Sequence, residues 1–415
     1  MDTMSIEIPD TNALLHRAEL AQYGDSIPPL CADGFRRGGA FHLSSVLPAL
    51  SAAIGCPVAT AVHHDPKALQ RALGIPDCTS AIVVLVDGMG FWNLNIRLGH
   101  VPYMRSLMED SVNQRPISTC FPSTTVAAMG TFGTGTCPGL TGMTGYTQRN
   151  SETGELSQLI QFKNAPEPHD LQRQPTIFES LTSQGVRATS CGMAKFANSP
   201  LTQAALRGSH YVSGTNAQSR VLAACKAAKT PGLTYLYIRD ADKIGHNYGW
   251  NSDEWIGAFE GIDSQLAMLR RCAPAGTLMV IVADHGMISA QPQERRDIAG
   301  DEALLQDVVL VGGEPRTPML YTQKESEVEG VVDRWQQHLS THAQVWARDE
   351  AIKEGLFGIV DDRVTKMLGN VIVSTSSATT IVDSRTQSDK ATRLPSVHGS
   401  QSFMEMDIPC LIDVA

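Results

Sequence analysis

Four apolar runs in the middle of the chain predict buried β-strands, and stretches with a helical pattern lie between them. The apolar runs cover residues 81–86, 185–191, 233–238 and 277–283. Runs of about six apolar and β-branched residues are typical of a parallel sheet whose two faces are both covered. The helical patterns include residues 125–132, 176–184, 218–229 and 252–272. This alternation predicts an α/β fold with a mostly parallel central sheet and helices on both faces.

The flanking regions have other patterns and predict the outer parts of the molecule. An N-terminal helix is expected at residues 43–54, and an amphipathic helix at 325–340 lies in a region richer in charge. We expect residues 369–374 to form a strand that returns to the core sheet, and the Ser/Thr-rich residues 376–394 to form a loop. The predicted organisation is a peripheral N-terminal segment at 1–78, a core at 79–290 and 370–415, and an inserted lobe at 291–369.

Length, charge and cysteine content narrow the class of protein. The 415 residues suffice for one large α/β core with an inserted lobe, and the net charge of −10 gives no reason to expect nucleic-acid binding. No apolar stretch reaches the ~18 residues that cross a membrane, and the N-terminus has no apolar signal region. The nine cysteines are scattered without a CxxC pair, which favours reduced thiols and a cytoplasmic location.

Two of the predicted strands are followed immediately by residues of the types that bind metal ions. Asp87 follows the first strand, and Asp284 and His285 follow the last one. Open α/β sheets bind ligands outside the carboxyl ends of their strands, so these positions favour a site. Taken alone, each pattern is also compatible with an ordinary turn, because aspartate is common in turns and helix caps.

Two further segments contribute ligands of the same kind. Asp242 and His246 follow the third strand, and their spacing of four places both on one side of a helical turn. Asp240 is a competing carboxylate in the same segment. His398 lies between a valine and a glycine in a late polar loop, where a lone histidine is usually incidental. The ligand interpretation of His398 therefore depends on the other segments.

Three aspartates and three histidines are about the number of ligands that two metal ions require. Zinc binds imidazole nitrogen and carboxylate oxygen, usually with four ligands, so a nucleophile, water or substrate would complete each ion. Paired ions ~3.5–4 Å apart stabilise both the attacking and the leaving oxygen of an in-line displacement. Magnesium would prefer more oxygen ligands, so zinc is the first expectation and manganese the second.

A nucleophile is expected where residues 120–135 lead into a helix of small residues. Thr125 stands at the start of that helix. A threonine there is commonly only a cap, but its oxygen also lies beside free backbone N–H groups that suit a phosphate. Bound to a divalent metal, a threonine hydroxyl can lose its proton near neutral pH and attack phosphorus. Cys120 and Thr124 compete for this role.

With these motifs in this order, the chain resembles the alkaline phosphatase superfamily, and within it the nucleotide pyrophosphatase/phosphodiesterase branch. The motifs are VDG at Asp87, DxxGH at Asp242 and His246, ADHGM at Asp284 and His285, and HG at His398. The resemblance extends over residues 80–405. It implies an alkaline-phosphatase-like three-layer sandwich and a metal-dependent hydrolase of phosphate esters.

The resemblance also selects among the candidate nucleophiles. In this superfamily the nucleophile lies ten residues before the glycine of a Thr-Gly pair, and Thr134-Gly135 therefore points to Thr125. Cys120 begins a sequence similar to the C-x-P-S-R motif of sulfatases. Thr124 stands where sulfatases need arginine, so the sulfatase alternative fits less well.

By resemblance, the ligands divide between two ions. Asp242, His246 and His398 would hold the ion that coordinates the attacking water. The other ion, which activates the nucleophile, would be surrounded by Asp87, Asp284, His285 and Thr125. The phosphoryl group would pass to Thr125 and form a covalent phosphothreonine, which water then releases.

The chain departs from the family pattern at the positions that contact substrate. Val126 stands where nucleotide pyrophosphatases usually carry phenylalanine, and residues 141–146 replace a stretch that supplies a phosphate-binding asparagine. Tyr146 is our candidate for that contact. Lys195 and Phe196, after the second strand, could line the pocket, but they are equally compatible with an ordinary loop.

The first hypothesis is therefore a phosphodiesterase or pyrophosphatase that acts on a small phosphate ester. A phosphomonoesterase is an alternative, although no arginine lies in the helix after Thr125 to bind a second phosphate charge. A phosphonate hydrolase or phosphomutase would use the same metal motifs. The intact threonine nucleophile argues against a fourth alternative, a non-catalytic metal-binding protein.

Overall fold

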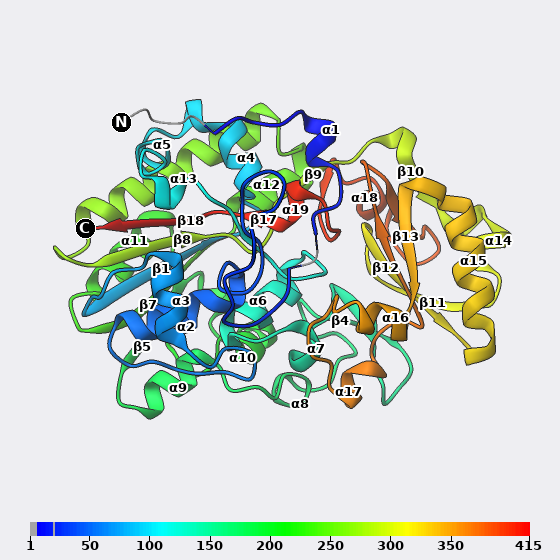
Figure 1. Ribbon diagram of the computed structural model, residues 1–415, viewed down its shortest axis with the longest axis horizontal. Coiled ribbons are helices and arrows are strands. Elements are labelled where there is room, and N and C mark those ends of the chain that lie inside the picture. Colours follow the sequence, from blue (N-terminus) through cyan, green and yellow to red (C-terminus); the bar gives the residue numbers. More distant parts are fainter. Residues whose placement is uncertain (1–5, 20) are drawn as a thin grey trace.

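A six-stranded sheet with helices on both faces forms the larger part of the molecule (Figure 1). The computed structural model describes residues 6–19 and 21–415, so the first residues of the predicted N-terminal segment lie outside the described residues. The strands, in spatial order, are β18 (Cys410–Val414), β8 (Leu278–Val282), β1 (Ser80–Val86), β7 (Gly232–Ile238), β5 (Arg187–Gly192) and β6 (His210–Ser213). All neighbours are parallel except β18, which is antiparallel to β8. The predicted α/β fold with a mostly parallel sheet is confirmed.

The four predicted strands occupy the centre of this sheet, because their side chains are buried on both faces. Every residue of β1 is buried, and Val83 lies in register with Tyr235 of β7 and Val280 of β8. The two edge strands, β6 and β18, did not stand out in the sequence, since the residues of β6 and the end of β18 are partly exposed.

Helices cover the sheet in two layers (Figure 1). One layer consists of α2 (Leu43–Ala53), α3 (Pro66–Leu73), α6 (Thr125–Thr134), α9 (Ile177–Ser183) and α10 (Pro200–Ala205). The other consists of α4 (Phe91–Ile96), α5 (Pro102–Leu107), α11 (Ala217–Ala227), α12 (Asp240–Tyr248) and α13 (Asp253–Cys272). All residues of α2 are buried, so this helix of the N-terminal segment packs within the main hydrophobic core.

A second sheet lies beside the first, on the right of Figure 1. Its antiparallel strands, in order, are β13 (Ala343–Ala347), β14 (Val371–Thr375), β12 (Thr317–Thr322), β11 (Val308–Glu314), β3 (Thr147–Arg149) and β4 (Leu156–Gln158). The amphipathic helix expected at residues 325–340 is α15 (Val328–Leu339), which packs on this sheet with α14 (Glu302–Leu305). Because β3 and β4 also take part, the second sheet includes more of the chain than residues 291–369.

The prediction that residues 369–374 return to the core sheet is wrong. Strand β14 pairs with β12 and β13 in the second sheet, where Val373 lies opposite Val345. Both faces of β14 are apolar because each meets its own cluster. Val373 packs with Trp335 of α15, and Ile372 packs on the opposite side with Phe357.

Short elements connect the two sheets and bring the C-terminal part of the chain beside the core. The paired strands are β2 (Ile117–Ser118) with β17 (Asp407–Ile408), β9 (Ile288–Ser289) with β16 (Ser396–Val397), and β10 (Arg295–Asp297) with β15 (Thr380–Val382). The remaining short helices are α1 (Thr11–Leu14), α7 (Pro138–Thr141), α8 (Pro168–Leu171), α16 (Arg348–Lys353), α17 (Asp362–Thr365), α18 (Asp389–Thr392) and α19 (Phe403–Met406). Among the described residues, no helix is both long and apolar enough to span a membrane.

Candidate metal centre

The carboxyl ends of three neighbouring strands bring the predicted ligands together. Asp87 follows β1, Asp284 follows β8, and Asp242 lies in the first turn of α12 after β7. Gly88 permits this close approach, because its φ is +76° and an added Cβ would lie 2.9 Å from Asp242 Cα. The backbone N–H of Asp242 donates to the carbonyl oxygen of Asp87 at 2.9 Å, which joins the two segments.

The first ligand group comprises Asp87, Asp284 and His285, all of them buried. One ligand atom from each lies within 4.8 Å of the other two. His285 Nε2 lies 3.6 Å from Asp87 Oδ1 and 3.4 Å from Asp284 Oδ2. The hydroxyl of Thr125 lies beside this group, 3.2 Å from His285 Nε2 and 3.4 Å from Asp87 Oδ1.

The second predicted ligand group comprises Asp242, His246 and His398. Of these, Asp242 and His398 form a compact cluster of ligand atoms with His285, and His246 lies beside that cluster rather than in it. Asp242 Oδ1 lies 3.1 Å from His246 Nε2 and 3.7 Å from His398 Nε2, and the two histidine nitrogens are 3.2 Å apart. His285 also approaches this group, and its ring stacks on that of His398 with centroids 3.6 Å apart. Asp240, the competing carboxylate, belongs to neither cluster of ligand atoms among the described residues.

Each histidine is oriented by a hydrogen bond from its Nδ1 to a backbone carbonyl oxygen. His246 donates to Ser396 at 2.8 Å, and His285 donates to Gly286 at 3.0 Å. His398 donates to Ser123 at 2.9 Å. These bonds turn every Nε2 toward the cluster, which is how metal-binding histidines are normally oriented.

The carboxylates of Asp87 and Asp284 are held in the same manner, with one oxygen bonded to the protein and one facing inward. Asp284 Oδ1 accepts the N–H groups of Gly88 and His285, both at 3.0 Å. Asp87 Oδ2 accepts the hydroxyl of Tyr237. Asp284 Oδ2 and Asp242 Oδ1 are buried and accept no hydrogen bond from the described residues. Buried polar oxygens without a partner are costly, and a bound cation would satisfy them.

The electrostatics of the cluster also favour a cation. Burial, together with the charges of Asp284 and Asp242, raises the pKa of Asp87 well above its ordinary value, and burial raises the pKa of Asp284 to about 6. Although burial opposes ionisation, the neighbouring His246 lowers the pKa of Asp242, and burial lowers the pKa of His398. Three carboxylates and three imidazole rings supply the oxygen and nitrogen ligands that zinc prefers.

The nucleophile candidates differ in what surrounds them. Thr125 begins α6, is half-buried, and faces the first ligand group. Thr124 is the N-cap residue and hydrogen-bonds the carboxyl group of Glu314 instead. Cys120 is buried, its Sγ lies 3.7 Å from the carbonyl oxygen of Pro122, and burial raises its pKa to about 12. The geometry therefore favours Thr125.

The predicted substrate contacts lie around the rim. The side chain of Tyr146 is 42% exposed, and its backbone N–H donates to Glu314 Oε1 at 2.6 Å. Lys195 is exposed, while Phe196 packs edge-on against Tyr237, with ring centroids 5.8 Å apart. The Tyr237 hydroxyl donates a hydrogen bond to Asp87, so Phe196 contacts the residue that orients a member of the first ligand group. A substrate-binding role for Tyr146 stays a prediction.

Sequence reasoning missed two residues next to the centre. Tyr237 is the last residue but one of β7 and orients Asp87, but a tyrosine in an apolar strand carries no local signal of that role. Glu314 comes from β11 of the second sheet, and burial raises its pKa to about 7. Only the packing of the two sheets brings it beside Thr124, so no pattern in the sequence could place it there.

Comparisons with known proteins identify the family and the fold. The family model described as type I phosphodiesterase/nucleotide pyrophosphatase matches residues 81–401. No curated protein is significantly similar to the chain in sequence. Among solved structures, murine ectonucleotide pyrophosphatase/phosphodiesterase 5, as an inactive variant in complex with AMP, has a TM-score of 0.65 at 15% identity. That match covers 80% of this chain and 87% of the murine chain.

A second similar structure is phosphonoacetate hydrolase from Sinorhizobium meliloti 1021 in complex with phosphonoformate. Its TM-score is 0.63 at 20% identity, with 81% of this chain and 90% of that chain covered. Both likenesses show the fold alone. Since the family model covers most of the sequence, the chain belongs to the type I phosphodiesterase/nucleotide pyrophosphatase family.

Proposed function

We propose that this protein is a two-metal hydrolase of phosphate diesters that acts through Thr125. One observation carries the proposal. The Thr125 hydroxyl lies at the start of α6, within 3.4 Å of ligand atoms from both Asp87 and His285. A hydroxyl in this position is poised both for a metal ion and for a phosphate bound at the helix N-terminus.

The residues assigned to each ion follow the two ligand groups. Asp87, Asp284, His285 and Thr125 would hold one ion, and Asp242, His246 and His398 the other, with zinc as the first expectation and manganese as the second. When bound, such ions lower the pKa of coordinated hydroxyl groups and stabilise charge on the attacking and leaving oxygens.

The reaction would proceed through two successive displacements at phosphorus. Thr125 Oγ1 attacks phosphorus, the bond from phosphorus to the leaving alcohol breaks, and a threonine phosphoester forms. Water then cleaves the bond between phosphorus and Thr125 Oγ1 and restores the hydroxyl. The free N–H groups in the first turn of α6 hold the non-bridging oxygens during both steps.

A diester is favoured over a monoester because the site offers little positive charge of its own. The helix after Thr125 has the sequence TVAAMGTFGT, without arginine or lysine. The nearest buried side chain on the Thr124 side is Glu314, a carboxyl group. A monoester carries a second negative charge near neutral pH, and no cationic side chain of α6 would neutralise it.

A phosphonate hydrolase is the second candidate, and three cations favour it. Burial lowers the pKa of Lys195, and the positive charges of the neighbouring Arg239 and Lys243 lower it further. Arg239 and Lys243 flank the start of α12, which carries Asp242. A carboxylate attached to the phosphonate would suit this rim, as in the ligands phosphonoacetate and phosphonoformate of the S. meliloti enzyme.

The test compares substrates on the purified protein with its metal content measured. We expect hydrolysis of bis-p-nitrophenyl phosphate to exceed that of p-nitrophenyl phosphate, and phosphonoacetate is assayed beside them. Thr125→Ala should abolish turnover, while Thr131→Val in the same helix, which removes a hydroxyl without a partner among the described residues, should not. Preference for phosphonoacetate would favour the second candidate, and preference for the monoester would refute both.

The expected setting is the cytoplasm, and the expected partner is a small phosphate ester. All nine cysteines are free thiols in the structure, five of them buried. Reduced thiols of this kind suit a reducing compartment. Fractionation of the native host cells, with the protein followed by antibody, would test this location.

A further inference from the structure

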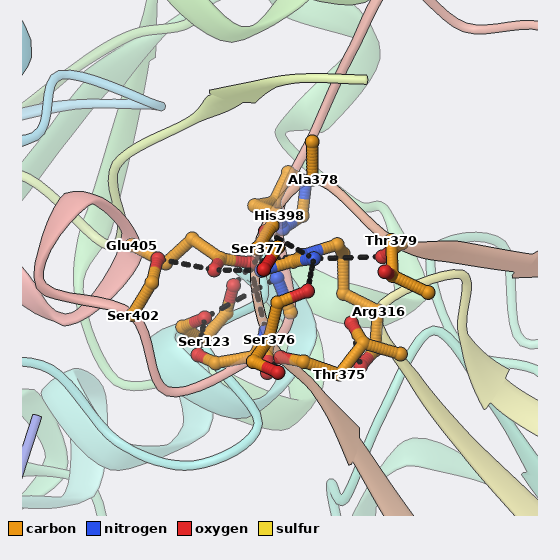
Figure 2. A network of polar contacts seen from close by, with 12 residues as sticks. Ser123, Arg316, Thr375, Ser376, Ser377, Ala378, Thr379, His398, Ser402 and Glu405 are labelled. Atoms are coloured by element: carbon orange, nitrogen blue, oxygen red, sulfur yellow. Dashed lines mark hydrogen bonds and ion pairs between the residues drawn. The ribbon is translucent and has the colours of Figure 1, made fainter. Parts of the chain in front are cut away.

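A buried ion pair connects the second sheet to the candidate metal centre (Figure 2). Arg316 lies in the turn between β11 and β12, and Glu405 lies in α19. Arg316 Nε donates to Glu405 Oε1 at 3.1 Å, and Nη2 donates to Oε2 at 2.8 Å. Both side chains are completely buried.

Glu405 holds the two loops that carry His285 and His398. Its Oε1 accepts the N–H of Ser400, two residues after His398, at 2.9 Å. Its backbone carbonyl accepts the N–H of Gly286, the residue after His285, at 3.0 Å. One residue therefore fixes both loops, and the imidazole rings that they carry stack with centroids 3.6 Å apart.

The loop of His398 is held from its other side by Ser123. The Ser123 hydroxyl donates to the carbonyl oxygen of Ser400 at 2.6 Å and accepts the N–H of Gly399 at 3.2 Å. The Ser123 carbonyl accepts His398 Nδ1. The loop thus lies between Glu405 and the segment that leads into Thr125, and Figure 2 shows Ser123, His398 and Glu405 within one network.

Arg316 anchors this network to the second sheet. Its Nη1 donates to the carbonyl oxygens of Thr379 at 2.7 Å and Ser377 at 3.0 Å, in the segment after β14. A buried ion pair gains little stability, because the desolvation of both charges offsets their attraction. The pair is therefore better explained by the geometry that it imposes than by stability.

We propose that Arg316 and Glu405 are positioning residues that set the spacing of His285 and His398, and with it the spacing of the two metal ions. The inference rests on the proposed function, since it assumes that both ligand groups bind ions. Outer partners that orient metal ligands typically change metal affinity by about 10–100-fold when they are removed.

The test replaces the pair by apolar side chains of similar volume, Arg316→Met with Glu405→Leu, so that no charge is left unpaired. The matched control is Arg37→Met with Asp407→Leu. That pair is also buried and doubly bonded, both distances being 2.7 Å. Its side chains also bond Asp33 and Trp92, but they do not bond the histidine loops. Manganese(II) is the probe, with stepwise affinities from calorimetry and the spin coupling between paired ions from electron paramagnetic resonance.

We expect the wild-type protein and the control to bind two spin-coupled ions. The Arg316/Glu405 variant should lose about 10–100-fold in affinity for at least one ion, and with it the coupled signal. Equal affinities and coupling in that variant, or an equal loss in the control, would overturn the inference. If the double variant does not fold, Arg316→Lys, which keeps the charge but loses the two-pronged contact, carries the same test.

The outcome separates this inference from the proposed function. A wild-type protein that binds two ions but hydrolyses no ester refutes the proposed function and leaves the positioning role intact. A wild-type protein that binds fewer than two ions overturns both.

Discussion

Glu314 offers a prediction whose size follows directly from its surroundings. Its carboxyl group is 8% exposed, accepts the N–H of Tyr146, and is bonded by Thr124 next to the candidate nucleophile. Burial raises its pKa from an ordinary 4.5 to about 7. Glu314→Gln keeps the shape and the acceptor oxygen and removes only the charge.

The sign follows from where the proton binds. Between pH 4.5 and 7 the folded protein holds a proton on Glu314 that the unfolded chain has lost. The free energy of unfolding of the wild-type protein therefore falls as pH rises through this window. The variant has no carboxyl group at this position, so its free energy of unfolding does not fall for this reason. At about 1.4 kcal/mol for each pH unit, Glu314→Gln should be about 3 kcal/mol more stable than wild type at pH 8, and nearly equal at pH 4.5.

Urea unfolding of the metal-free proteins at several pH values between 5 and 8 measures this difference. Glu254→Gln, at an exposed position of α13, controls for the loss of one negative charge. A stability difference between Glu314→Gln and wild type that stays constant across the range would refute the reasoning. Confirmation would mean that the protein keeps a destabilising carboxyl group beside its candidate site.

Three further predictions concern the metal ions. Asp284→Asn and Asp242→Asn each remove one charged ligand, and each should lower the bound metal by about one equivalent in elemental analysis; an unchanged content would contradict the assignment. Tyr237→Phe removes the bond to Asp87, so zinc affinity should fall about 10–100-fold in a competition titration, and an unaltered affinity would argue against that support. Chelation should lower the melting temperature in calorimetry and zinc should restore it, because an ion at a thousand times its Kd adds about 4 kcal/mol; a melting temperature indifferent to metal would exclude tight binding.

Much of the site could be predicted because its signals are local. Asp87 and Asp284 directly follow strands that are apolar throughout, and parallel strands end at one edge of a sheet. The spacing between Asp242 and His246 needs only one helical turn. His398 has no such local signal, and its inclusion depended on the other ligand segments and on the family resemblance; in the structure its ring stacks on that of His285.

What could not be predicted depends on contacts between distant segments. Strand β14 is apolar on both faces, as a core strand is, yet its neighbours are those of the second sheet. Glu314 and the Arg316–Glu405 pair reach the metal centre only because the second sheet packs against the first. In the sequence these charged residues resemble ordinary surface residues, and only the fold buries them.

The central claim is that Thr125 attacks phosphorus, and trapping the covalent intermediate tests it most directly. The metal-loaded protein is quenched in acid during turnover of bis-p-nitrophenyl phosphate, digested and mapped by mass spectrometry. We predict a p-nitrophenyl phosphate adduct on Thr125, absent from Thr125→Ala. An adduct on Cys120 or Thr124 instead, or unchanged turnover by Thr125→Ala, would contradict the account.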